Sequence, residues 1–450
     1  MAPEARIEPR LGALDGAMIV VSLVIGVGIF RTPAMVAAAT GSGALFLAAW
    51  GIGALVSAAG ALAFAEIGAR FPHAGAYYKV VAASFHPALA FALNWAQLLM
   101  QGAGAAGVAF LGAEYLLALA TAGHPVEPRA VTATALALIG VLLGLNFLGI
   151  RSGARTQNLL SASKLLLLAA LAAAGLLWAP AAPEPTAHAP AAGGAAGLIA
   201  GLVAVFYTYG GYQQTMNMAG DLRDPRRSLP RAIGWGMAAV LALYLAINAA
   251  YLGALGLDRM ASGKLVAADL ARAGFGPLGQ GIVSLAIFLS AAGFVNATLL
   301  QLPRSYFAMA EDGALPRAFL AVRRGAQTQD AALALVGVTM LVPALFLGSF
   351  EKLLQYVMFT DALTLVTVAS CLFVLRRRRI GEEEGEPFRT PGYPWLPGLF
   401  VAVLAAVALR VLWQETGLAL AGLGILAAGF PLFFGLRRLA ARPGGAPGPR

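Results

Sequence analysis

Charged residues are scarce in this sequence, and the stretches that lack them are long. Asp, Glu, Lys and Arg make up 12% of the 450 residues, whereas hydrophobic residues make up 59%. Charge is absent from six long stretches, which are 32–65, 80–113, 130–150, 185–220, 232–257 and 273–303. About 20 apolar residues in a helix cross the hydrocarbon core of a bilayer. These stretches exclude a soluble globular domain and predict a polytopic membrane protein.

Cysteine and histidine are nearly absent as well. Cys371 is the single cysteine, so an internal disulfide is excluded. The four histidines lie in or beside predicted loops without the spacing of metal ligands, at His73, His86, His124 and His188. The sequence shows no nucleophile–base pair, metal cluster or phosphate-binding loop, so no enzyme, metal site or cofactor is predicted. Strand patterns are also missing, and the expected fold class is all-α.

Twelve apolar spans are predicted along the chain. They cover 13–39, 43–69, 87–120, 130–150, 156–178, 195–220, 231–255, 277–302, 331–349, 353–375, 395–413 and 416–436. The connection 179–194 is rich in Pro and Ala and is expected to be an extended or flexible link on the outer side. The tail ARPGGAPGPR at the C-terminus is expected to be disordered.

Positive charges divide unequally between the two sides of the predicted membrane. With residues 1–12 in the cytoplasm, 23 Lys and Arg fall on the inner side and six on the outer side. The positive-inside rule therefore predicts that 1–12 and the tail 439–450 are cytoplasmic. This asymmetry also explains the net charge of +10. The lipid bilayer, and not nucleic acid, is the expected partner.

Glycine interrupts two of the predicted spans near their middle. GVGIF (26–30) lies in the first span, and YTYGGY (207–212) lies in the sixth. Unwound backbone at membrane depth is tolerated only where it lines a protected cavity. Paired interruptions in two halves of a chain indicate the binding site of a secondary transporter. The alternative is that the glycines only allow helices to pack closely.

The spacing of the interruptions predicts an internal repeat. They are 180 residues apart, and each opens a set of five spans. An odd number of spans inverts the second set relative to the first. The predicted organisation is repeat 1 over 13–178, repeat 2 over 195–375, and two further helices over 395–438.

Five motifs, in order along the chain, carry a resemblance to a known family. They are VIGVGIFRTP (24–33), ALAFAEIGARFPHAGAYY (61–78), YTYGGYQQTMNMAGDLRDPRRSLPRAI (207–233), NATLLQLPRSYFAMAEDGALP (296–316) and PFRTPGYPWLP (387–397). Here the sequence resembles the amino acid–polyamine–organocation (APC) superfamily and, within it, the bacterial L-type amino acid transporter (LAT-like) light-chain group. The resemblance implies a LeuT-like five-plus-five inverted repeat with helices 1 and 6 broken. It also implies sodium-independent amino-acid transport by alternating access.

The chemistry of an amino acid fits the two interruptions. The start of a half-helix offers free N–H groups and positive dipole charge, which suit a carboxylate. The end of a half-helix offers free carbonyls, which suit an ammonium group. We expect the carboxylate on the amides of Val27, Gly28 and Ile29. We expect the ammonium on the carbonyls of Val24, Ile25 and Tyr207. The full predicted substrate-binding set is Val24, Ile25, Gly26, Val27, Gly28, Ile29, Tyr207, Thr208, Tyr209 and Gly210.

Individual positions refine this expectation. Val27 stands where the family has Ser or Thr, so a side-chain hydroxyl to the carboxylate is missing. Tyr207 resembles the aromatic gate that covers the substrate from outside, and Gly210 leaves space for a side chain. The alternative for the tyrosines is packing alone. No acid lies near Gln213, which favours neutral over cationic substrates.

Two charged residues inside predicted spans are candidates for coupling or gating, together with Tyr207. Lys164 resembles a lysine that takes the place of sodium in sodium-independent relatives, where it ties the fifth helix to the first near Gly26. The alternative is a lysine that extends to the inner interface. Asp361 has four open roles: facing the substrate path, carrying a proton, anchoring a gate, or bonding neighbouring helices.

The remaining polar residues in or beside the spans have expected structural roles. Helix–helix contacts are expected from Asn94, Gln97, Gln101 and Asn296, and loop contacts from Glu66 and Asp312.

The leading function is exchange of neutral L-amino acids, and four alternatives stay open. Two of them are proton-coupled uptake and a cationic amino acid or polyamine substrate. A channel or a membrane-embedded enzyme would belong to a different class. Eukaryotic light chains carry a cysteine between helices 3 and 4 that bonds a glycoprotein partner. Residues 120–129 have none, so no disulfide-linked heavy chain is expected.

Overall fold

The computed structural model describes residues 8–121, 126–177, 194–262, 266–346, 350–382, 386–414 and 416–440. Nearly all of the predicted 179–194 link and the final ten residues of the predicted tail lie outside these ranges. Within the described ranges the regular structure is helical, and β-structure is limited to two isolated bridges. The all-α prediction is therefore confirmed.

Sixteen α-helices and three 3₁₀ helices make up this part of the chain. The first eight α-helices are α1 (Ala13–Val24), α2 (Gly28–Thr40), α3 (Gly43–Arg70), α4 (Ala76–Ser84), α5 (Pro87–Ala120), α6 (Pro128–Phe147), α7 (Ile150–Leu177) and α8 (Ala195–Tyr209). The others are α9 (Pro225–Leu255), α10 (Leu257–Ser262), α11 (Val266–Phe275), α12 (Gly279–Glu311), α13 (Asp330–Phe346), α14 (Phe350–Arg378), α15 (Trp395–Gln414) and α16 (Thr416–Ala440). The 3₁₀ helices are η1 (Tyr212–Asp221), η2 (Gly276–Leu278) and η3 (Arg317–Leu320).

Most of the predicted spans agree with these helices to within a few residues, and the exceptions have physical causes. Helix α12 continues to Glu311, nine residues beyond the predicted end, because its last turns are buried by protein rather than by lipid. Hydropathy does not detect such an extension. The short helices α4, α10 and α11 lie in connections and were missed for the same reason.

Ten segments of the described chain are both long and apolar enough to cross a membrane. Nine described helices or helix–3₁₀ segments are long and apolar enough, and the bent pair α1–α2 makes a tenth. The two remaining predicted spans correspond to α13, which is apolar but 17 residues long, and to α14, with 29 residues. The chain is therefore a polytopic helical protein.

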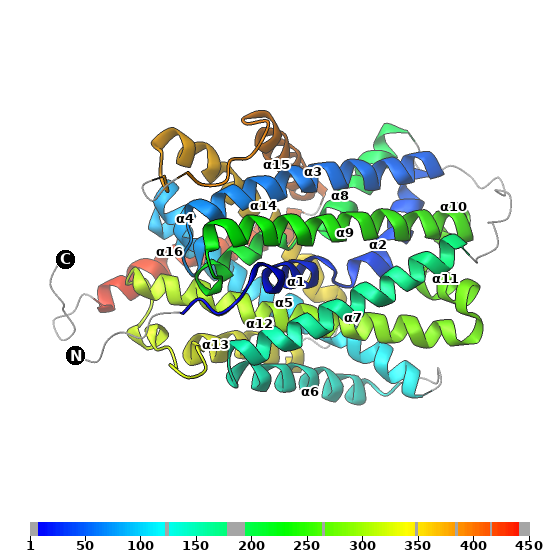
Figure 1. Cartoon of the computed structure of the whole chain (residues 1–450), viewed down its shortest axis with the longest axis horizontal. Coiled ribbons are helices and arrows are strands. Elements are labelled where there is room, and N and C mark those ends of the chain that lie inside the picture. The colour runs from blue at the N-terminus through cyan, green and yellow to red at the C-terminus, as the bar shows by residue number, and fades with distance from the viewer. Residues whose placement is uncertain are drawn as a thin grey trace.

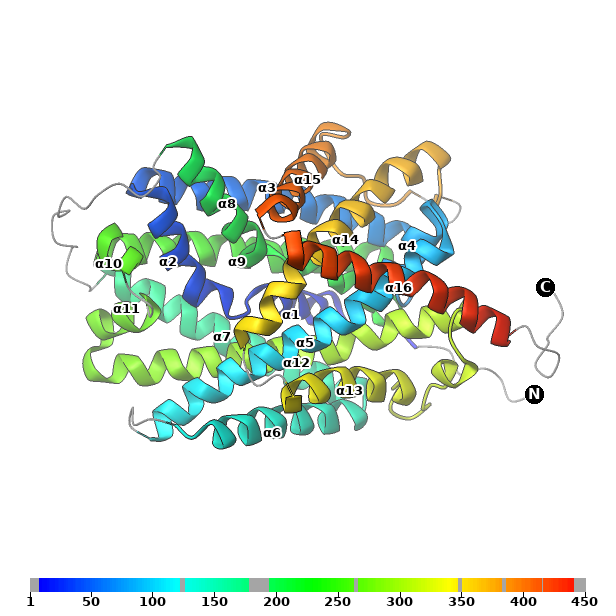
Figure 2. The same ribbon diagram turned by 180° about the vertical axis from the view of Figure 1, so that it is seen from behind.

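The long helices form two packed groups (Figures 1 and 2). Helices α1, α3, α8 and α9 pack on one another, and we call them the bundle. Helices α5, α6, α12 and α13 form a second group, which we call the scaffold. Helix α7 contacts both groups. Helix α12 lies at the centre, since 72% of its apolar window is buried, against 22% for α15 and α16.

Candidate functional site

The first helix is broken where the glycine pattern predicts. Helix α1 ends at Val24, α2 begins at Gly28, and their axes differ by 45°. The amide of Gly26 donates to the Val24 carbonyl at 2.8 Å, which closes a tight turn. Among the described residues, the amides of Val27, Gly28 and Ile29 donate to no backbone carbonyl outside the regular helices. They are the free N–H groups of a helix start.

The sixth predicted span is also interrupted, but three residues later than Tyr207. Helix α8 continues through Tyr209, and the break is confined to Gly210 and Gly211. Gly211 has φ +118°, and a β-carbon there would lie 2.4 Å from the Leu23 carbonyl oxygen. Only glycine satisfies both conditions. The chain resumes as η1, and a 3₁₀ rather than an α-helix completes the span.

The two breaks lie side by side. The hydroxyl of Thr208 donates to the hydroxyl of Thr32 at 2.8 Å, which joins α8 to α2. A β-carbon on Gly28 would lie 3.2 Å from the Thr208 methyl group. Together with the contact of Gly211 on Leu23, these distances bring two segments 180 residues apart into one site.

Open space remains at this site. Four residues at the breaks are partly exposed, although most of their neighbours are buried: Gly26, Gly28, Tyr207 and Gly210. Among the described residues, a β-carbon on Gly26 would meet only the ring edge of Phe294, at 3.9 Å. Gly26 therefore borders open space, whereas Gly28 lies at the contact between α2 and α8.

Phe294 is a wall of this space that the sequence reasoning missed. It is partly exposed, whereas the residues beside it on α12 are buried. The available signal was one aromatic residue among small ones in SAAGFVNA (290–297). Helical periodicity alone did not show which way that ring points.

Lys164 reaches the end of the first half-helix. Its side chain is fully buried, and its ammonium donates to the Ile25 carbonyl at 2.7 Å and to the Ser22 carbonyl at 3.3 Å. The alternative of extension to the inner interface is wrong. The predicted tie between the fifth predicted span and the first break is present. A carbonyl that α1 leaves unpaired thereby gains a charged donor.

The three carbonyls predicted to bind a substrate ammonium differ in how many hydrogen bonds they already accept. The Val24 oxygen already accepts from the Gly26 amide at 2.8 Å and from the Tyr244 hydroxyl at 3.1 Å. A carbonyl has two lone pairs, so Val24 has none left. The Ile25 oxygen accepts from Lys164, and the Tyr207 oxygen accepts from the Gly210 amide at 3.2 Å. The Ile25 oxygen therefore keeps one lone pair.

Two predicted binding side chains are engaged in helix packing. Thr208 is held by Thr32 and by the Ala204 carbonyl. The ring of Tyr209 lies 5.7 Å from that of Trp50 and 5.2 Å from that of Tyr244. For Tyr209 the packing interpretation is the one that its contacts support.

Asp361 lies on α14. It is partly exposed, and one carboxylate oxygen accepts from the Gln97 amide of α5 at 3.2 Å. The carboxylate also lies within electrostatic range of Tyr207. Asp361 therefore bonds a neighbouring helix and lies near Tyr207.

Asn296 holds three helices together, as expected. Its amide donates to the Gly153 carbonyl at 3.1 Å and to the Gln157 side chain at 2.8 Å on α7. Its oxygen accepts from Asn146 of α6 at 2.7 Å. This buried network fixes α12 against the helix that carries Lys164.

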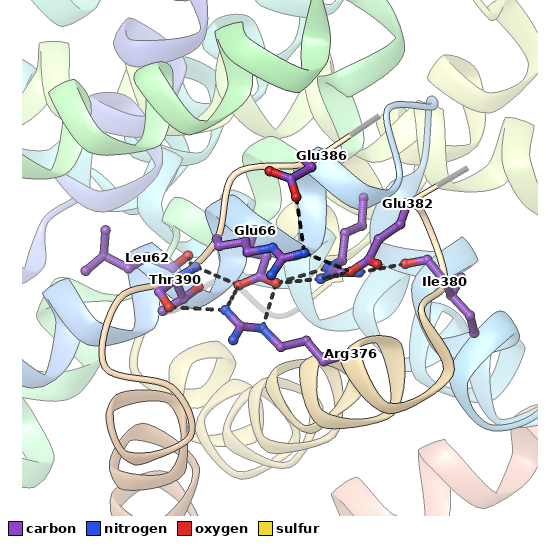
Figure 3. A network of polar contacts seen from close by, with 9 residues as sticks. Leu62, Glu66, Arg376, Ile380, Glu382, Glu386 and Thr390 are labelled. Carbon is purple, nitrogen blue, oxygen red and sulfur yellow. Dashed lines mark hydrogen bonds and ion pairs between the residues drawn. The ribbon is translucent and has the colours of Figure 1, made fainter. Parts of the chain in front are cut away.

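A second polar cluster closes the end of the molecule where α3 and α14 finish (Figure 3). The buried carboxylate of Glu66 accepts from Arg70 at 3.0 Å, from Arg376 at 2.6 Å and from the Thr390 amide at 2.7 Å. Arg70 also donates to Glu382 at 3.0 Å. Glu66 thus holds the segment between α14 and α15, which confirms its predicted role.

The bundle and scaffold meet at this same end through a buried ion pair. Arg304 of α12 donates to Asp221 of η1 at 2.9 Å. The amides of Arg10 and Leu11 both donate to the Asp221 carbonyl at 2.9 Å. Burial raises the pKa of the nearby Asp312 carboxyl, although Lys79 acts in the opposite direction. The Asp221 contacts tie η1 to α12 and to the segment before α1.

This arrangement defines a class of protein. Two breaks in apolar helices lie side by side, and no metal-binding cluster occurs in the described residues. Such a site binds and releases a small polar solute inside a membrane, and the class is that of secondary transporters. A family model described as amino acid permease matches residues 11–428, and the chain belongs to that family within the APC superfamily.

Curated relatives agree with this assignment along nearly the whole chain. The serine/threonine exchanger SteT of Bacillus subtilis is 27% identical over 441 residues, covering 96% of this chain and 98% of SteT. The large neutral amino acids transporter small subunit 2 of Mus musculus is 27% identical, covering 95% of this chain and 81% of the relative. The b(0,+)-type amino acid transporter 1 of Mus musculus is 26% identical, covering 91% of this chain and 84% of the relative. The chain is an amino-acid transporter by family, and not an enzyme.

Proposed function

We propose that the protein exchanges neutral L-amino acids across a bacterial inner membrane without sodium. It works by alternating access on a LeuT-like five-plus-five inverted repeat of twelve spans, with both termini in the cytoplasm. The observation that carries this proposal is the Lys164 ammonium on the Ile25 carbonyl. The Lys164 side-chain nitrogen occupies the carbonyl end of the first break, where a bound cation would otherwise be needed.

The substrate head group is held by backbone atoms. Its carboxylate accepts from the free amides of Val27, Gly28 and Ile29. Its ammonium donates to the Tyr207 carbonyl, in the last turn of α8. Tyr207 covers the site, and Phe294 bounds the space for the side chain.

A residue just beyond the second break, Gln213, favours neutral substrates. The Gln213 side chain accepts from the Gly211 amide at 3.0 Å, so it caps the break. An acid that would pair with a second positive charge is absent from this position. The names of the relatives, a serine/threonine exchanger and a large neutral amino acids transporter, support the same choice.

The moving parts are the bundle and the scaffold. In this structure the Asp221–Arg304 pair joins them at the end that we propose to be cytoplasmic. Opening toward the cytoplasm requires that pair to separate. The 120–129 segment has no cysteine for a disulfide-linked heavy chain, so the carrier is proposed to act alone.

Counterflow in proteoliposomes tests the proposal. Vesicles loaded with unlabelled leucine, alanine or serine are diluted into the same labelled amino acid, with sodium or with choline as the cation. Exchange predicts uptake that depends on internal amino acid and is equal in both salts. Uptake into empty vesicles at the same rate, or uptake that needs sodium, contradicts it.

Proton-coupled uptake is the second candidate, favoured by the partly exposed Asp361 near Tyr207. Under the exchange mechanism, Asp361→Asn weakens the bond to Gln97 and slows transport, but the dependence of the rate on pH keeps its shape. Exchange rates measured from pH 5 to 8 for both proteins check this. A pH dependence that disappears in the variant would favour the proton-coupled mechanism.

Gly26→Ala is expected to weaken substrate binding without destabilising the protein. Its β-carbon has ordinary contact with the Phe294 ring at 3.9 Å, so the fold accommodates it. The methyl group nevertheless enters the substrate space, at a cost of about 1 kcal/mol, or roughly a fivefold higher KM. Gly51→Ala on α3 is the control, since a β-carbon there has no described neighbour within 4 Å. Equal KM values for the two variants would contradict the assigned site.

A further inference from the structure

An apolar groove runs between α7 and α9 on the outside of the molecule. Six residues of α7 between Leu165 and Leu176 and four of α9 between Ala239 and Ala246 line it, and every one is Ala or Leu. Its volume is about 530 Å³. Leu166 is 72% exposed and Leu176 is 53% exposed, so the groove opens to the surroundings of the protein.

The groove follows the end of α1 along the two helices. Up to Val24, α1 contacts both of them: Ser22 and Met18 contact Ser161 of α7, and the backbone of Ala17 lies against Gly236 of α9. Ile25 contacts Lys164 of α7, and the lining of the groove begins at the next residue of α7, Leu165. Helix α2 then turns toward α8.

We propose that this groove seats one acyl chain of a membrane phospholipid. Both helices are apolar and long enough to cross the membrane, so the exposed leucines at the rim lie among lipid tails. A lining made of apolar side chains does not hold ordered water. The groove is therefore continuous with the hydrocarbon around the protein and is filled by it.

The dimensions of the groove suit an acyl chain. Twelve residues of α7, from Leu165 to Leu176, span roughly 18 Å at 1.5 Å per residue. A single methylene chain is slender enough to lie between the alanine faces.

Photolabelling tests directly whether an acyl chain occupies the groove. The full chain is placed in nanodiscs with a phosphatidylcholine that carries a diazirine on one acyl chain, irradiated without substrate and mapped by peptide mass spectrometry. The expected result is several-fold more label on α7 165–176 and α9 239–246 than around Val141, a 62% exposed position on α6. Equal labelling of groove and control surface overturns the proposal.

Groove-filling variants sharpen the test. Ala242→Trp and Ala169→Trp replace exposed groove residues, and each should abolish the excess label, whereas Val141→Trp should leave it unchanged. Either groove variant suffices if the other folds poorly. Excess label that persists in a folded groove variant, or a dimer cross-link across the groove in place of lipid label, contradicts the proposal. Because labelling is measured without substrate, its outcome is independent of whether the protein exchanges amino acids.

Discussion

Replacing Lys164 by alanine is expected to abolish most of the exchange activity while leaving the protein folded. The variant removes a charged donor from the Ile25 carbonyl, a hydrogen bond of about 1.5–3 kcal/mol. If that bond supports the transport-competent state, the rate falls roughly ten- to a hundredfold. Stability should be kept, since losing a fully buried charge also relieves its desolvation. Counterflow rates and the melting temperature in detergent measure the two effects separately.

Lys79→Ala is the matched control for this experiment. Lys79 pairs with Glu311 at 2.5 Å, and both side chains keep solvent contact. Such pairs contribute about 0–1 kcal/mol, so the control should transport at close to the original rate. A Lys164→Ala protein with full activity would show that the tie to the first break has no part in transport.

Replacing Glu66 by alanine is expected to cause the largest loss of stability. The carboxylate has no exposed surface and neutralises Arg376 and Arg70 while accepting the Thr390 amide. Removing one partner of a buried ionic group costs about 3–5 kcal/mol, because the other charges stay buried without compensation. The expected result is a melting temperature several degrees lower and a loss of monodisperse protein on size exclusion.

Glu386→Gln tests whether charge alone explains that loss. Glu386 is 89% exposed and lies 3.8 Å from Arg389, in the same segment that Glu66 holds. A surface change of this kind is expected to alter stability by less than about 0.5 kcal/mol. Equal melting temperatures for the Glu66 and Glu386 variants would refute the assignment of Glu66 as the anchor of this segment.

The first break was predictable at residue level, and the second was not. Gly26 and Gly28 flank one residue, so both ends of the interruption are marked in the sequence. In YTYGGY the aromatic residues can remain helical, and α8 uses them to pack on Trp50 and Tyr244. The position of the second break is set by the contact of Gly211 with Leu23, a long-range contact that no local pattern reports.

The buried lysine was the most informative single residue in the sequence. A charge in the middle of an apolar run has to find a partner, and the carbonyls freed by a nearby break are such partners. Which carbonyls are already occupied could not be predicted. The hydroxyl of Tyr244, more than 200 residues away in the sequence, donates to the Val24 carbonyl and occupies it. Phe294 was likewise hidden, because burial on α12 extends around the whole helix.

The polar residues of α12 have a consequence for biogenesis. Asn296, Gln301, Arg304 and Ser305 would each be costly to leave against lipid. Their partners are Asn146, Gln157, Asn217 and Asp221. Every one of these precedes α12 in the chain and has left the ribosome before it. The partners of these polar side chains are therefore already in the membrane when α12 inserts. No later segment is needed to form these hydrogen bonds.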